Sequence, residues 1–94
     1  MLYENTIAAT ATSSGNGSIS VIRVSGKETF AAVSNIFCDG KGNRIDLSRY
    51  ETHTIHYGFI CDGSNRLLDE VLVLLMKAPR SYTREDVIEI HCHG

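Results

Sequence analysis

The sequence lacks a long hydrophobic run and an excess of basic residues, and each absence excludes a class of protein. The longest apolar stretch, residues 71–76, is far shorter than the ~20 residues of a transmembrane helix and suits a buried strand. Residues 1–5 contain neither the basic region nor the apolar run of a signal peptide. A net charge of -2 gives no field for tight phosphate binding by this segment alone. We therefore expect a cytoplasmic protein with no membrane partner.

Cysteine and proline are also scarce. The three cysteines are odd in number and lack CxxC spacing, which fits neither a disulfide framework nor a zinc site and indicates a reducing compartment. One proline and eight glycines in 94 residues are too few to indicate disorder. A hydrophobic content of 43% with 21% charged residues predicts one small globular domain, whose modest core would gain stability from a partner surface.

Alternation of apolar and polar residues, separated by turn-forming residues, predicts mainly β-structure. Ser25 is a candidate helix cap, and the helical spacing that follows predicts a helix over residues 27–37. We expect turns at residues 12–18 and 62–65, and an exposed loop with little function at residues 39–48. The predicted strands are residues 6–11, 19–24, 53–61, 67–77 and 87–93. The fold class is therefore α+β, with a small, mostly antiparallel or mixed five-stranded sheet and one or two helices.

The last predicted strand has a polar face formed by Glu89, His91 and His93, opposite an apolar face that includes Cys92 as a small core residue. A Glu-x-His-x-His row is able to bind a divalent metal, but it is also typical of a solvated or interface-facing sheet surface.

Two charged residues, Arg23 and Glu70, interrupt apolar strands. Either they contact a ligand, or they pair with each other across the sheet or point to water.

The segment from Lys77 to Asp86 has an unusual density of binding groups. It combines a proline, two arginines, two hydroxyl side chains, a tyrosine and two carboxylates. These groups suit a flat polar ligand, although a solvated loop has a similar composition.

The same segment carries a resemblance to a known family. Residues 76–86, together with the Glu-Ile-His-Cys-His-Gly sequence at 89–94, resemble the N-terminal domain of the tRNA-modification GTPase family MnmE, also called TrmE. Residues 5–9, 17–19, 22–26 and 69–73 resemble the strands that precede this motif in the family.

The resemblance implies a fold like the tetrahydrofolate-binding domains of aminomethyltransferases, and a homodimer that binds 5-formyltetrahydrofolate near its interface. Carried over residue by residue, it places six positions near the folate and implies no catalytic or metal-binding residue. Glu70 is expected to accept hydrogen bonds from the pterin, Tyr82 to stack and the arginines to meet the glutamate tail. The six positions are Arg23, Glu70, Arg80, Ser81, Tyr82 and Glu85.

The resemblance also implies a larger parent protein. In the family, a helical domain and a GTPase that uses potassium and magnesium follow this domain, and the parent acts with the flavoprotein MnmG on the wobble uridine of tRNA. We expect residues 1–94 to be the folate-binding and dimerisation domain, shortened at its C-terminal end and not catalytic by itself, with the GTP hydrolase elsewhere in the parent. The family's C-terminal cysteine motif is absent, so no catalytic thiol is assigned. The alternatives are a metal-dependent enzyme built on Glu89, His91 and His93, and a stand-alone folate-dependent one-carbon transferase.

Overall fold

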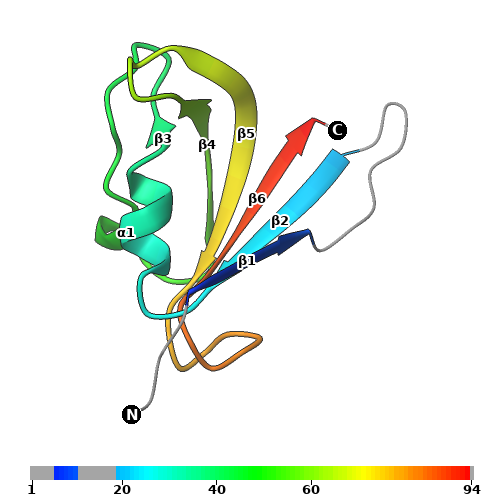
Figure 1. The fold of residues 1–94 in the computed structure, drawn as a ribbon. Helices are drawn as coiled ribbons and strands as arrows, with labels where there is room; N and C mark the ends of the chain where they lie inside the picture. The colour runs from blue at the N-terminus through cyan, green and yellow to red at the C-terminus, as the bar shows by residue number, and fades with distance from the viewer. Residues whose placement is uncertain (1–5, 11–18, 94) are drawn as a thin grey trace.

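The structure, a computed structural model, describes residues 6–10 and 19–93. The predicted turn at 12–18 lies outside this range. The strands of the described part are β1 (Ile7–Thr10), β2 (Ile19–Ser25), β3 (Phe37–Cys38), β4 (Thr54–Cys61), β5 (Leu67–Met76) and β6 (Val87–His93). A single α-helix, α1 (Thr29–Ser34), and a 3-10 helix, η1 (Leu47–Arg49), complete it (Figure 1).

The six strands form one antiparallel sheet in the order β1-β2-β6-β5-β4-β3. The α+β class is confirmed, as is the turn at 62–65, which joins β4 and β5 into an antiparallel hairpin. The expected number of five strands is wrong. The extra strand, β3, is only two residues long and pairs Phe37 with Ile60 and Cys38 with Phe59. Such a short strand has too few positions to show an alternating pattern.

One face of the sheet carries the core and is covered by α1 (Figure 1). Alternate residues of the central strands point to this side, and the helix adds Val33 to them. The buried side chains that pack together are Val24, Val33, Phe37, Leu47, Val71, Val73, Leu75, Ile88 and Ile90. The opposite face, which we call the open face, carries Arg23, Glu89 and His91 instead. Cys92 packs against the core as predicted.

The helix is shorter than the predicted 27–37, because both ends make other contacts. Its N-terminal flanking residue is Glu28, which makes no side-chain capping bond, so the prediction that Ser25 is the cap is wrong. At the other end, Phe37 leaves the helical path and lies over Gly58. A Cβ atom built at Gly58 would be 2.4 Å from Cζ of Phe37, so the ring occupies space that only glycine leaves open.

The segment at 39–48, predicted as an exposed loop, is more ordered than expected. Leu47 begins η1 and is fully buried, and Arg44 forms an antiparallel bridge with Cys38. The Asp46 carboxylate accepts a hydrogen bond of 3.0 Å from the amide of Ser48 and starts the 3-10 turn. The mostly polar composition of this segment therefore led to a wrong prediction for Leu47, which belongs to the core.

Candidate functional site

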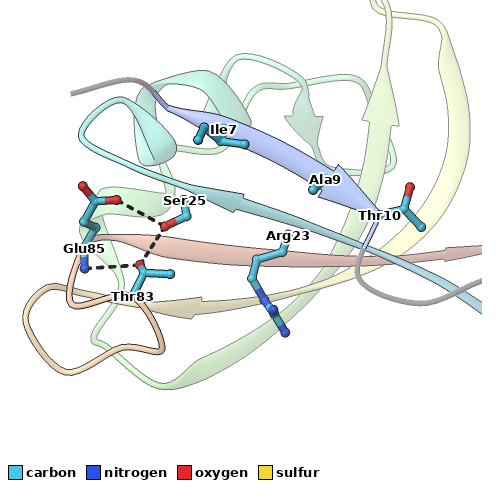
Figure 2. A pocket seen from close by; sticks show the side chains of 7 residues that line it. All are labelled: Ile7, Ala9, Thr10, Arg23, Ser25, Thr83 and Glu85. Carbon is cyan, nitrogen blue, oxygen red and sulfur yellow. Dashed lines mark hydrogen bonds between the residues drawn. The ribbon is translucent and has the colours of Figure 1, made fainter. Parts of the chain in front are cut away.

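A pocket of about 330 Å³ opens where β1, β2 and the loop at 77–86 meet. We call it the β1–β2 pocket. Figure 2 shows its apolar side formed from β1 and its polar side formed from β2 and the loop. Its lining residues are Ile7, Ala9, Thr10, Arg23, Ser25, Thr83 and Glu85. An apolar wall facing a few polar groups is the usual make-up of a small-molecule site.

The loop at 77–86 is held in place by Asp86 at its end. The Asp86 carboxylate accepts a hydrogen bond of 2.9 Å from the Ala78 amide, which closes the loop. The Asp86 carbonyl accepts bonds of 3.0 Å from the Gly26 amide and 3.1 Å from the Thr29 hydroxyl. The loop is therefore tied both to its own start and to the turn between β2 and α1.

Side-chain contacts then join the loop to β2. The hydroxyl oxygens of Ser25 and Thr83 lie 2.7 Å apart, and the Ser25 hydroxyl lies 3.4 Å from a Glu85 carboxylate oxygen (Figure 2). The Ser81 hydroxyl donates to the Glu85 carbonyl within the loop. These contacts present two hydroxyls and a carboxylate on one wall, a set that both donates and accepts hydrogen bonds.

Arg23 connects the pocket to the open face. Its Nε and Nη2 atoms both donate to Oε2 of Glu89, at 3.0 and 2.6 Å, and its guanidinium carbon lies 4.9 Å from the centroid of the Tyr82 ring. A cation over an aromatic face at this distance is attractive. Arg23 therefore takes part in both an ion pair and a ring contact.

Glu89 is the most buried charged group of this cluster. Its side chain is 11% exposed, against 39% for Arg23, and Nε2 of His91 lies 3.3 Å from its second oxygen. Burial by itself would raise the pKa of Glu89, but the hydrogen bonds from Arg23 and His91 outweigh it and leave the pKa below its ordinary value. The carboxylate is therefore held ionised.

The structure brings four of the six predicted folate positions close together: Arg23, Ser81, Tyr82 and Glu85. Arg80 lies exposed on the same loop. Sequence reasoning missed Ser25 and Thr83 as lining residues, although Thr83 stands inside the segment whose density of polar groups it noted. The density of polar groups at residues 77–86 therefore indicated the loop that lines the pocket, but it did not indicate that the loop contacts β2.

Glu70 lies elsewhere on the open face, and the suggestion that it pairs with Arg23 is wrong. It accepts a hydrogen bond of 2.6 Å from the Tyr57 hydroxyl, which raises the pKa of Tyr57. Strand β6 lies between β2 and β5, and the pairing aligns Arg23 with Glu89 and Glu89 with Leu74. From standard strand spacing and rise, the Cα atoms of Arg23 and Glu70 are roughly 17 Å apart.

A second hollow, of about 300 Å³, lies beside Glu70 on the open face. Leu72 and His91 are among its lining residues, so the hollow lies between Glu70 and Arg23 on the open face. Around it Ile55, Tyr57 and Leu72 are 61%, 59% and 45% exposed. The open face thus carries both a hollow and a row of exposed apolar side chains.

The predicted metal-binding row is described only in part, because the side chain of His93 lies outside the described atoms. Glu89 is already bonded to Arg23 and close to His91. Among the side chains that the structure describes, no three His, Cys, Asp or Glu residues gather as metal ligands.

The helices of the described part are all too short to cross a membrane.

Comparison with known proteins adds a family to this geometry. The model of the family described as the GTP-binding protein TrmE N-terminus matches residues 6–94. The chain is 50% identical over 90 residues to the tRNA modification GTPase MnmE of Lachnoclostridium phytofermentans and 53% identical over 91 residues to that of Lactiplantibacillus plantarum. Each match covers 96% of this chain and 19% of the relative. The MnmE of Moorella thermoacetica is 51% identical over 94 residues, which are 99% of this chain and 20% of the relative. The chain therefore spans about a fifth of the curated relatives that it matches.

Proposed function

The chain belongs to the TrmE N-terminus family, and from this premise we propose that it is the folate-binding and dimerisation module of a tRNA-modifying GTPase. One observation carries the proposal at the level of residues. Arg23 of β2 and Glu85 of the distant loop at 77–86 line one pocket, and the Tyr82 ring of the same loop lies 4.9 Å from the guanidinium carbon of Arg23.

The residues present suit the chemistry of 5-formyltetrahydrofolate, which when bound would supply a one-carbon unit. A carboxylate is a good acceptor for the amino and ring N–H groups of a pterin, and we assign this role to Glu70. Tyr82, 68% exposed, offers a free ring face for stacking. Arg23 and Arg80 supply positive charge for the carboxylates of the glutamate tail.

The spacing of these groups favours an elongated ligand lying across the open face. Glu70 and Arg23 are roughly 17 Å apart. A single ligand that contacts both must be long, with a flat hydrogen-bonding group at the Glu70 end and an acidic group at the Arg23 end. The second hollow, with Leu72 among its lining residues, gives that molecule an apolar surface between the two ends. We propose that Ser81 and Glu85 shape the loop around the acidic end, Ser81 through its bond to the Glu85 carbonyl.

Exposed apolar side chains support the dimerisation half of the proposal. Ile55, Tyr57 and Leu72 are each close to or more than half exposed on neighbouring strands, and a patch of this kind is a common feature of association surfaces. We propose that this row lies in the contact between two copies of the chain.

The remaining activity is assigned to other parts of the parent. The relatives are named tRNA modification GTPases, and this chain spans only about a fifth of them. We propose that other parts of the parent hydrolyse GTP with potassium and magnesium. We propose further that the parent acts with an MnmG-type flavoprotein on the wobble uridine of tRNA, and that this module supplies the folate site.

Calorimetry with 5-formyltetrahydrofolate tests the folate site. We expect Glu70→Gln and Arg80→Ala each to weaken binding by about tenfold, the loss expected for one hydrogen bond to a charged group. Glu85→Gln is expected to change it least. Arg66→Ala is the matched control, because its side chain is 78% exposed on the hairpin turn. Unchanged affinity in both Glu70→Gln and Arg80→Ala would overturn the assignment.

Light scattering on the same samples tests dimerisation separately. Ile55→Asp places a charge in the exposed row, at a position that does not line the hollow assigned to the ligand, and is expected to shift the mass towards that of one chain. Ile36→Asp adds the same charge at a position that is 37% exposed beside α1 and is expected to leave the mass unchanged. A mass that is the same for both variants contradicts the proposed contact. One-carbon transfer by this chain alone, with no GTPase segment, would instead favour the stand-alone transferase.

A further inference from the structure

Two buried cysteines lie on neighbouring strands at the edge of the sheet farthest from the β1–β2 pocket. Cys38 ends β3 and is 0% exposed, and Cys61 ends β4 and is 3% exposed. The Cys61 amide donates to the carbonyl of Ile36 at 2.9 Å, which places Cys61 opposite Ile36. Cys38 stands two residues further along β3, so the two cysteines are diagonal neighbours on the same face of the sheet.

Arg44 adds a positive charge to this pair. Its backbone bridges that of Cys38, while its Nη1 atom lies 2.7 Å from Sγ of Cys61. Among the described residues, no carboxylate forms a salt bridge with this guanidinium.

The guanidinium is held in this position by main-chain carbonyls. Nε of Arg44 donates to the carbonyl of Asn35 at 2.7 Å, and Nη2 donates to that of Asp62 at 2.9 Å. The side-chain oxygen of Asn65 accepts a further hydrogen bond of 2.9 Å from Nη1. All three of these acceptors are neutral, and the nearby Asp62 carboxylate interacts with the guanidinium only through its charge. The guanidinium is therefore fixed against the sulfur of Cys61.

The environment of Cys38 differs from that of Cys61. Each thiol donates to a main-chain carbonyl, Cys38 to that of Phe59 at 3.5 Å and Cys61 to that of Ile36 at 3.8 Å, so the difference lies in the charge beside the sulfur. Burial first, and then the neighbouring Cys61 thiol, raise the pKa of Cys38 to about 11. Cys38 is therefore protonated at neutral pH, and only Cys61 has a cation directly beside its sulfur.

We propose that Cys38 and Cys61 form a reversible intramolecular disulfide on reaction with a peroxide, with Cys61 as the attacking residue, Cys38 as the resolving residue and Arg44 as the positioning residue. This inference does not depend on the folate site. It rests on the placement of the two thiols on adjacent strands and on the guanidinium beside one of them.

The reaction balances in two steps. The Cys61 thiolate attacks one oxygen of hydrogen peroxide, the O–O bond breaks, and the departing hydroxide takes up the proton that the thiol released, giving water and a sulfenic acid. The Cys38 sulfur then attacks the Cys61 sulfur, the S–S bond forms, the S–O bond breaks, and the hydroxyl leaves as water with the Cys38 proton. Two thiols are oxidised and one peroxide is reduced to two molecules of water.

Access to the buried sulfurs is provided by β3, which is a two-residue strand at the edge of the sheet. Short edge elements open locally at low free energy. Once formed, the disulfide would fix β3 to β4 and resist that opening, so the oxidised chain is expected to unfold at a higher denaturant concentration than the reduced chain.

The test is graded oxidation of the intact chain with hydrogen peroxide, followed by alkylation of free thiols and peptide mapping. We expect the loss of two of the three thiols, a mass lower by two hydrogen atoms, a linked pair of peptides containing Cys38 and Cys61, and full reversal by a dithiol reductant. Cys92→Ser is expected to behave like the unaltered chain, because Cys92 lies on β6. Cys61→Ser is expected to lose the cross-link.

Arg44 is tested by rate. Arg44→Gln is expected to slow the formation of the disulfide by about tenfold, the effect of losing one hydrogen bond to a charged group, because it removes the contact of Nη1 with Sγ of Cys61, and Arg44→Lys is expected to keep most of the rate. The unaltered chain decides the proposal even if a variant does not fold. Links that involve Cys92, oxidation of single thiols without a cross-link, or oxidation of Cys92 while Cys38 and Cys61 remain reduced would each overturn it.

Discussion

The ion pair of Arg23 and Glu89 predicts that its two halves differ in their effect on stability. Glu89 is 11% exposed and Arg23 is 39% exposed. Removing Arg23 leaves a carboxylate that is mostly buried, and His91 is then the one side chain of the described residues that lies within hydrogen-bond distance of it. Removing the charge of Glu89 instead leaves a guanidinium that already reaches water.

The magnitudes follow from these exposures. Breaking a fully buried pair costs about 3–5 kcal/mol, and exposure of the arginine side reduces this through solvent screening. We expect Arg23→Ala to lower the free energy of unfolding by about 2–3 kcal/mol and Glu89→Gln by about 1 kcal/mol. For a domain of this size, a difference of about 1–2 kcal/mol corresponds to roughly 4–16 °C in Tm.

The pH dependence gives an independent check. Because the pKa of Glu89 in the folded chain lies below its ordinary value, the stabilisation is complete above that ordinary value, near pH 4.3. It is lost as the pH falls through the lower folded pKa. The difference between the unaltered chain and Glu89→Gln is therefore expected at neutral pH and should disappear in strong acid.

Urea unfolding followed by far-ultraviolet circular dichroism measures these differences, since the chain has no tryptophan. Arg66→Ala is the control, because Arg66 is 78% exposed and its nearest carboxylate oxygen is 3.9 Å away; its effect should stay within about 0.5 kcal/mol. Equal losses for Arg23→Ala and Glu89→Gln, or a Glu89→Gln difference that persists in acid, would contradict the unequal burial of the two side chains.

Two further predictions concern the α1 side of the sheet. Leu47→Ala is expected to lower the free energy of unfolding by about 2–5 kcal/mol, because it leaves a cavity. Leu68→Ala, at a position that is 54% exposed, should change it by less than about 0.5 kcal/mol. Equal urea midpoints for the two variants would contradict the burial of Leu47. Burial lowers the pKa of His56, which stacks on Tyr50 with ring centroids 3.6 Å apart, so its NMR titration midpoint is expected below the ordinary value of about 6.5. The associated stability is present above that value and is lost as the pH falls through the folded pKa. Tyr50→Ala should move the midpoint back up, and a His56 midpoint at the ordinary value would count against this prediction.

Much of the fold was predictable from local pattern. The alternation in β6 correctly placed Ile88 and Ile90 in the core, with Glu89 on the other face, because a period of two is read directly from neighbouring residues. The hairpin of β4 and β5 was predictable for the same reason, since turn-forming residues separate two alternating runs.

What escaped prediction depends on which segments meet in space. No local pattern in the sequence shows that β6 lies between β2 and β5. Glu70 was therefore one of the partners considered for Arg23, whereas the structure pairs Arg23 with Glu89. The contact of Ser25 with Thr83 joins residues 58 positions apart. Phe37 fitted a helical spacing equally well, and only the space above Gly58 decides that it belongs to a strand.

That space has a consequence for how sequences of this fold are able to vary. The ring of Phe37 and a side chain at position 58 would claim the same volume, so a large residue at 37 requires glycine at 58. The reverse does not hold. A Cβ at position 58 would also lie 2.8 Å from the carbonyl oxygen of Cys38, a backbone atom that no trimming of residue 37 removes. Glycine at 58 therefore permits side chains of many sizes at 37, whereas a smaller side chain at 37 does not free position 58 to change. Of these two positions, only 37 is expected to vary.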